Sequence, residues 1–212
     1  ERITKINDIS QAQNSQETTR QTGRDNNLSV SPRFNLKLQN NQQIIISPFV
    51  AYNQDQRDAY TQRSLNIVNQ ELESNDGERL TGRLITEWKQ QGQQNNEQSI
   101  KLFVQAEDEN TDKTTYQTLQ TANQLTYQEN TDRTERELAL DGRIKSIFLE
   151  THIVSSGFEW RTKNTKEQLF KQQLLSNDSN IKEQRMALWW QDEWLLSEKH
   201  TVTYGLRWQQ FD

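Results

Sequence analysis

The sequence predicts an all-β fold, an antiparallel up-and-down meander of about nine long strands. Two observations indicate it: apolar and polar residues alternate strictly along many segments, and short and long connections alternate between these segments. Successive side chains of a strand point to opposite faces, so each segment has one apolar and one polar face. The alternation is clearest at Leu28, Val30, Phe34, Leu36 and Leu38, and it returns in 80–88, 138–144 and 202–208.

In chain order, we expect strands at about 2–10, 20–39, 42–54, 79–90, 97–108, 134–145, 149–162, 183–196 and 200–211. The first also fits a helical period. Short turns are expected at Asn40-Asn41, from Gln91 to Asn96, from Ser146 to Phe148 and from Ser197 to Lys199, and long polar loops at 11–19, 55–78, 109–133 and 163–182. Because alternate connections of a meander lie on the same side, one rim would carry tight turns and the other long loops.

Composition argues against a packed soluble core. Only 31% of the 212 residues are hydrophobic, and the mean hydropathy is −1.09, whereas soluble domains carry about 45–50% apolar residues. A membrane barrel needs apolar residues only on its outside, and its strands cross with about 9–11 residues. We therefore expect one domain, 1–212, that is part of a transmembrane β-barrel.

Other bulk features exclude several classes of protein. The net charge is −5 and no basic patch is present, so nucleic acid is not an expected partner. The chain has no cysteine, which excludes a disulfide scaffold or a thiolate metal site. No apolar run approaches the roughly 18 residues of a membrane helix. The chain begins without Met and ends directly after a strand, and we interpret it as an internal piece of a longer protein.

Aromatic and charged residues at particular strand positions suggest what each face would contact. Tryptophans near segment ends suit the aromatic belts at the two membrane surfaces: Trp88, Trp160, Trp194 and Trp208. The outward apolar face would include Leu36, Leu84, Leu140, Ile144, Val154, Leu188, Val202 and Leu206. The opposite phase carries candidates for facing the lumen or a plug, although a plain solvated face explains them as well: Arg33, Arg83, Glu87, Arg143, Glu159, Arg161 and Arg207. Asp192 breaks the period, since it shares the phase of Trp190 and Trp194; a bulge or a place at the membrane edge would resolve this.

The region 186–208 resembles a known family. Leu188-Trp189-Trp190-Gln191-Asp192-Glu193-Trp194-Leu195-Leu196, followed by Tyr204-Gly205-Leu206-Arg207-Trp208, is similar to a hairpin of TonB-dependent outer-membrane receptors. Val30 to Leu36 and Ser156 to Arg161 resemble other strands of that family. The resemblance implies a twenty-two-stranded barrel around a plug domain, which imports siderophores, cobalamin or other scarce nutrients with energy from the TonB complex. This chain shows no TonB box, no plug and no terminal aromatic strand.

The sequence shows no convincing catalytic or metal site. Asp108, Asn110 and Asp112 mimic the start of a calcium loop, but Lys113 and Leu119 stand where its glycine and closing glutamate belong. The two histidines, His152 and His200, lie on separate expected strands and make a poor metal site. We expect no catalysis, no metal and no cofactor.

The sequence therefore favours an outer-membrane barrel for active nutrient uptake in a Gram-negative bacterium. Its expected partners are outer-membrane lipid, the plug and remaining strands of the same protein, the TonB complex and a small solute such as a siderophore, which the loops 55–78, 109–133 and 163–182 would help to bind. Two alternatives remain: a passive porin or adhesin-type barrel, and a soluble low-complexity β interaction protein.

Overall fold

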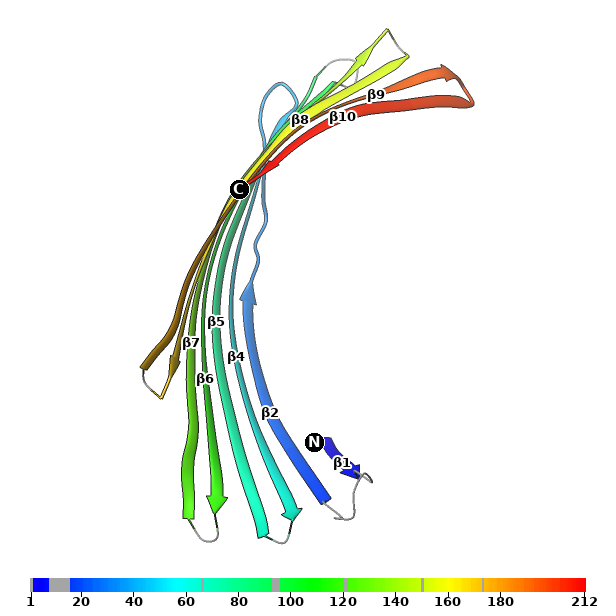
Figure 1. Ribbon diagram of the computed structural model, residues 1–212. Helices are drawn as coiled ribbons and strands as arrows, with labels where there is room; N and C mark the ends of the chain where they lie inside the picture. The colour runs from blue at the N-terminus through cyan, green and yellow to red at the C-terminus, as the bar shows by residue number, and fades with distance from the viewer. Residues whose placement is uncertain are drawn as a thin grey trace.

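The computed structural model shows one curved antiparallel sheet (Figure 1). It describes residues 2–7, 16–65, 67–92, 96–119, 122–149, 151–172 and 174–212, and these contain no helix. The strands are β1 (Arg2–Asn7), β2 (Gln16–Val30), β3 (Phe34–Lys37), β4 (Gln42–Leu65), β5 (Ile67–Gln91), β6 (Glu97–Leu119), β7 (Ala122–Phe148), β8 (His152–Lys171), β9 (Leu174–Ser197) and β10 (His200–Phe211).

Strands that are neighbours in sequence are neighbours in the sheet. The order is β1-β2-β4-β5-β6-β7-β8-β9-β10, and β3 pairs with β4 beside β2. The predicted antiparallel meander is confirmed, and within the described residues the sheet is open, because β1 and β10 do not pair. No helix in the described part of the chain has the length and apolar character needed to span a bilayer.

The first long strand of the sheet is broken by proline without losing its register. Val30 pairs with Val50 and Phe34 pairs with Ile46, so β2 and β3 keep the same alignment along β4. Between these pairs, Pro32 lies level with Pro48 in β4. Neither proline has an N–H to donate to the ladder. The break at 31–33 therefore follows from two facing prolines and leaves the alternation of faces intact.

Where the structure describes them, the short turns lie at one rim, close to where the sequence places them; the turn predicted from Gln91 to Asn96 lies partly outside the described residues. Asn40 and Asn41 both have positive φ (59° and 56°), as the two central residues of a type I′ turn require, and Gln42 N–H donates to Gln39 O across this turn. The turn after β9 spans Glu198 and Lys199. The turn predicted at Ser146 to Phe148 is wrong by a few residues, because β7 continues to Phe148 and Leu149 takes the positive φ of 52°.

The long loops predicted at 55–78, 109–133 and 163–182 are wrong. Within each of these ranges the two adjoining strands continue as a paired hairpin, through Leu65↔Ile67, Leu119↔Ala122 and Lys171↔Leu174. The range 11–19 lies partly outside the described residues, and β2 already begins at Gln16. The second rim is therefore formed by extended β-hairpins, visible at the lower end of the sheet (Figure 1). Strands in these hairpins pair through their backbones without an apolar face. The end of apolar alternation in the sequence therefore did not mark the end of a strand.

The sheet is a single layer without a packed core. Among the described residues, the buried apolar side chains are those of Ile45, Ala51, Ala139 and Ala187, all small or medium in size. Many large apolar side chains are exposed instead. The scarcity of apolar residues in the sequence thus corresponds to a wall with one coated face, and no second sheet covers that face within the described residues.

Candidate functional site

From β2 to β10, the register gives the sheet two faces that follow residue number. Trp208 pairs with Leu188, Leu188 with Phe158, Phe158 with Gly142 and Gly142 with Ile100, so even-numbered residues share one face across the strands. Partners directly opposite each other in a ladder point to the same side. The register shifts at Thr115/Tyr116 and Leu169/Phe170, near the hairpin tips, and at His200/Thr201, beside the turn before β10. In β1, odd-numbered residues pair with even-numbered residues of β2, as in Ile3↔Arg20.

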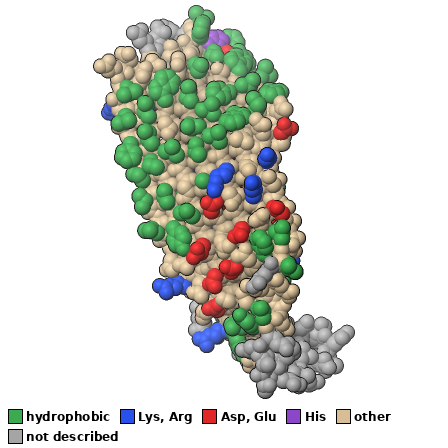
Figure 2. Space-filling view, turned by 90° about the vertical axis from the view of Figure 1, so that its left-hand side faces the viewer, with side chains coloured by type: hydrophobic (Ala, Val, Ile, Leu, Met, Phe, Trp, Pro, Cys, Tyr) green, Lys and Arg blue, Asp and Glu red, His purple; other side chains and the backbone are tan. Residues whose placement is uncertain are grey.

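The even-numbered face carries a band of apolar side chains. We call this the apolar band, and it consists of the even-numbered residues within 28–38, 44–52, 80–88, 100–106, 138–148, 154–160, 186–196 and 202–208. It covers the convex side of the sheet towards the short turns, whereas acidic side chains gather on the same side along the extended hairpins (Figure 2). All eight residues predicted for the outward face lie in the band, so their common face is confirmed.

The four belt tryptophans lie at the edges of the apolar band. Trp88 and Trp194 are at its edge towards the short turns, and Trp160 and Trp208 are at its edge towards the extended hairpins. Trp190 lies inside the band, and Trp189 points to the opposite face. Two tryptophans at each edge suit rings that prefer a membrane surface, and this role stays a prediction.

The odd-numbered face is concave, and charged candidates from the sequence share it. Six of them are odd-numbered residues of the regular register: Arg83, Glu87, Arg143, Glu159, Arg161 and Arg207. Arg33 is odd-numbered too, but it lies in the break between β2 and β3, outside the paired register. Their role towards a lumen or plug stays a prediction. The structure brings Arg207 to Glu159, with 2.9 Å between guanidinium nitrogen and carboxylate oxygen. Arg143 lies over the Trp189 ring at 5.8 Å, and Arg83 over the Phe49 ring at 4.8 Å.

Ion pairs continue along the concave face into the extended hairpins. Glu135 is only 8% exposed, and its carboxylate forms ion pairs with Arg133 and Lys163, each with 3.1 Å between nitrogen and oxygen. Arg79 contacts Glu109 at 2.7 Å and Glu107 at 3.7 Å. The hydrogen bond to Glu109 raises the pKa of Arg79, so this side chain stays charged at any physiological pH. Arg133 and Glu135 both lie on β7, whereas the pairs of Lys163 with Glu135 and of Arg79 with Glu107 and Glu109 cross strands, and the latter stabilise hairpins that have no apolar face.

Asp192 is the one charged residue of the apolar band. No bulge occurs at this position, since it pairs regularly with Val154 and Tyr204. Its carboxylate accepts hydrogen bonds from Tyr204 Oη at 2.7 Å and from His152 Nδ1 at 2.9 Å, and the residue is only 4% exposed. Trp194 stacks on His152 with 5.4 Å between ring centroids. Aromatic neighbours therefore cover a charge that alternation alone would point outwards, next to the rim of short turns.

Replacing Asp192 with Leu is expected to lower the denaturant midpoint of unfolding, although it removes the one charge of the band. The Tyr204 hydroxyl and His152 Nδ1 would lose their acceptor, and a covered donor without a partner destabilises the fold. Unfolding followed by circular dichroism in lipid vesicles measures this. Asp178→Leu is the control, since Asp178 is an exposed residue of the same strand outside the band. A midpoint unchanged or raised by Asp192→Leu would contradict a structural role for this cluster.

The other two motifs weighed from the sequence do not gather ligands. Asp108, Asn110 and Asp112 lie along β6 rather than in a loop; Asp108 pairs with Arg136 at 2.8 Å, and Asn110 donates to Asp132. His200 contacts Ser197, separately from His152. Within the residues described, no group of three or more His, Cys, Asp or Glu side chains is arranged to hold a metal ion.

Arg185 also lies on the concave face and was not among the residues predicted from the sequence. It is the register partner of Arg161 and lies over the Phe211 ring at 5.5 Å. Arg185 has the same odd-numbered phase in its strand as Ala187 and Trp189, and this phase could have indicated its face.

Comparisons with known proteins give a structural likeness but no likeness in sequence family. No family model matches the chain, and no curated protein matches it. Among solved structures, the chain is similar to the ferric citrate transporter FecA in its unliganded form, with a TM-score of 0.41 and 14% sequence identity. The match covers 98% of this chain and 36% of that chain, so the chain spans little more than a third of the transporter's length.

Proposed function

We propose that this chain forms part of the wall of a bacterial outer-membrane β-barrel, with its convex face in lipid and its concave face towards water or a plug. The apolar band supports this. It is continuous over eight neighbouring stretches of strand, its one charge is covered, and polar residues bound it on both sides. A soluble monomer rarely exposes an apolar patch larger than a few hundred Å².

The direction of the band across the strands is the observation that carries the proposal. On β4 its middle is Pro48, and the paired residues lead from there through Leu84, Val104, Leu138, Thr162 and Gln184 to Asp212. On β10 the middle of the band is Gly205, seven residues before Asp212. A shift of about seven residues over six strand steps inclines the strands by roughly 40° to the normal of the band, given ~3.3 Å per residue and ~4.8 Å between strands. Membrane barrel strands tilt by about 35–45°.

The finer proposal is that the parent protein takes up a scarce nutrient, such as an iron–siderophore complex, with energy from the TonB complex. The region 186–208, whose sequence resembles that family, lies within the hairpin of β9 and β10. The concave face offers charged side chains to a plug or a solute path, and the extended hairpins would form the outer mouth. A passive porin or adhesin is the alternative: uptake that persists without the TonB complex would favour it.

Labelling of single cysteines on β6 tests the placement in a membrane. The chain has no native cysteine, so each position from 100 to 112 can carry one environment-sensitive fluorophore. In lipid vesicles, we expect the even positions of 100–106 to be quenched by a nitroxide on the lipid chains and the odd positions by a water-soluble quencher. This alternation follows from the two faces of the strand.

Positions 107–112 of the same strand are the matched control, because they lie beyond the apolar band. There we expect the water-soluble quencher to act on both faces. Equal access of the water-soluble quencher to positions 100–106 would remove the membrane placement and favour a soluble β protein.

A further inference from the structure

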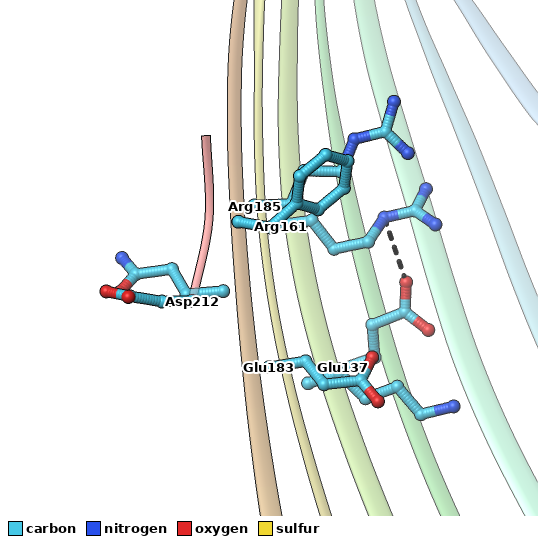
Figure 3. Close-up of a pocket in the computed structure, with 8 residues that line it drawn as sticks. Glu137, Arg161, Glu183, Arg185 and Asp212 are labelled. Atoms are coloured by element: carbon cyan, nitrogen blue, oxygen red, sulfur yellow. Dashed lines mark ion pairs between the residues drawn. The ribbon is translucent and has the colours of Figure 1, made fainter. Parts of the chain in front are cut away.

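Two arginines on the concave face lie directly opposite each other. Arg161 on β8 and Arg185 on β9 are register partners. Like charges in directly opposed positions destabilise a sheet, so such a pair requires compensation. In Figure 3 the two guanidinium groups extend in the same direction, over the strands and away from the backbone.

The compensation inside the chain is incomplete. Arg161 contacts Glu137 through Nε alone, at 3.2 Å, and its side chain is 55% exposed. Arg185 reaches Glu159 only at 3.5 Å, and this carboxylate is held more closely by Arg207 at 2.9 Å. The Nε of Arg185 is buried without a hydrogen-bond partner among the described residues. The contacts with described residues leave the two terminal nitrogens of Arg161 and Nη1 of Arg185 without a partner, so these N–H groups remain for a ligand on the concave face.

The two groups border a hollow of about 420 Å³. Phe211 forms an apolar part of its lining, and Glu183 lies at the other end, opposite its register partner Lys163. Guanidinium groups match a carboxylate or phosphate with parallel N–H donors. Glu183 disfavours a ligand that is anionic at both ends.

We propose that Arg161 and Arg185 form a binding site for a single carboxylate group on the concave face. The carboxylate can belong to a small solute or to a protein segment that fills the concave side, and in both cases it bridges the two guanidinium groups. The proposal rests on the proposed function only in that the concave face must be open to such a ligand.

Titration with propionate, followed by saturation-transfer NMR on the full chain in lipid nanodiscs, tests the site. We expect propionate to bind and the neutral propionamide not to bind. R161Q and R185Q are each expected to weaken propionate binding at least tenfold. R57Q is the control, because Arg57 is also an exposed arginine but lies on β4, outside this hollow. The proposal would be overturned if the unsubstituted chain, R161Q and R185Q bound propionate equally well. It would also be overturned if the unsubstituted chain did not bind propionate.

Two further measurements keep the outcomes separate. If R185Q does not fold, R185K decides: it keeps the charge but loses the planar fork, and unchanged affinity would overturn the bridging geometry. In cells, reaction of R185C with a small charged thiol reagent identifies a solute as the ligand, whereas protection identifies a protein carboxylate. The cysteine series on β6 reports the membrane placement independently, so failure of one proposal is distinguishable from failure of the other.

Discussion

Leu206→Arg is expected to destabilise the folded sheet in a lipid bilayer by about 2–4 kcal/mol if this position lies near the bilayer midplane. Leu206 is 77% exposed within the chain and belongs to the apolar band of β10. In water, a substitution at so exposed a position usually changes stability by no more than about 0.5 kcal/mol. The size of the effect therefore reports what surrounds the convex face rather than what packs inside the sheet.

Thr203→Arg is the matched control on the same strand. Thr203 is exposed on the concave face and pairs with Glu193 on β9, so a new arginine there meets an opposite charge. Reversible denaturant unfolding in lipid vesicles gives both free energies. Equal, small effects of the two substitutions would mean that the convex face does not contact lipid.

Period-two alternation was sufficient to predict the faces of the sheet. The positions Leu36, Leu84, Leu140 and Leu206 come from four different strands, and the structure places them on one face, as each local pattern required. The tight turn at Asn40-Asn41 was also predictable, because asparagine tolerates positive φ. These features depend on residues close together in the sequence.

The extended hairpins were not predictable from the same signal. The segments around Asp55 and Gly77 show no apolar alternation, because both faces of the hairpins there lie outside the apolar band. Their strands are held by backbone ladders and by polar pairs such as Ser74 with Asp58 at 2.8 Å. An alternation-based prediction therefore ends each strand where the apolar band ends, about half-way along the true strand.

The candidate sites needed the cross-strand register, which no single segment contains. Asp192 alone conflicts with its strand, and only its pairing with Tyr204 and the nearby His152 explains how its charge is accommodated. In the same way, Arg185 and Arg161 are twenty-four residues apart in the chain and become partners only through the pairing of β8 with β9. Sequence phase gave the face of each residue but not its neighbours.

Gly157→Ala is expected to destabilise the sheet by about 1–3 kcal/mol through overpacking. Gly157 faces the concave side, where the ring of Trp189 lies against it. An added Cβ would come within 2.5 Å of the carbonyl oxygen of Gly142 and 2.7 Å of the Trp189 ring. The ring can turn away, but the backbone oxygen of the neighbouring strand cannot move without disturbing the ladder.

Gly82→Ala is the matched control for this prediction, since Gly82 also lies inside a long strand and a Cβ there would meet no atom closer than 4.0 Å. It is expected to stabilise the sheet by up to about 1 kcal/mol, because alanine loses less backbone entropy than glycine on folding. Denaturant unfolding of both variants in lipid vesicles measures the difference, and Gly157→Ala combined with Trp189→Leu separates its two causes. If the double variant recovers the stability of Trp189→Leu alone, the ring is the obstacle. If it does not, the close approach of β7 and β8 at Gly142 and Gly157 excludes any side chain at this position.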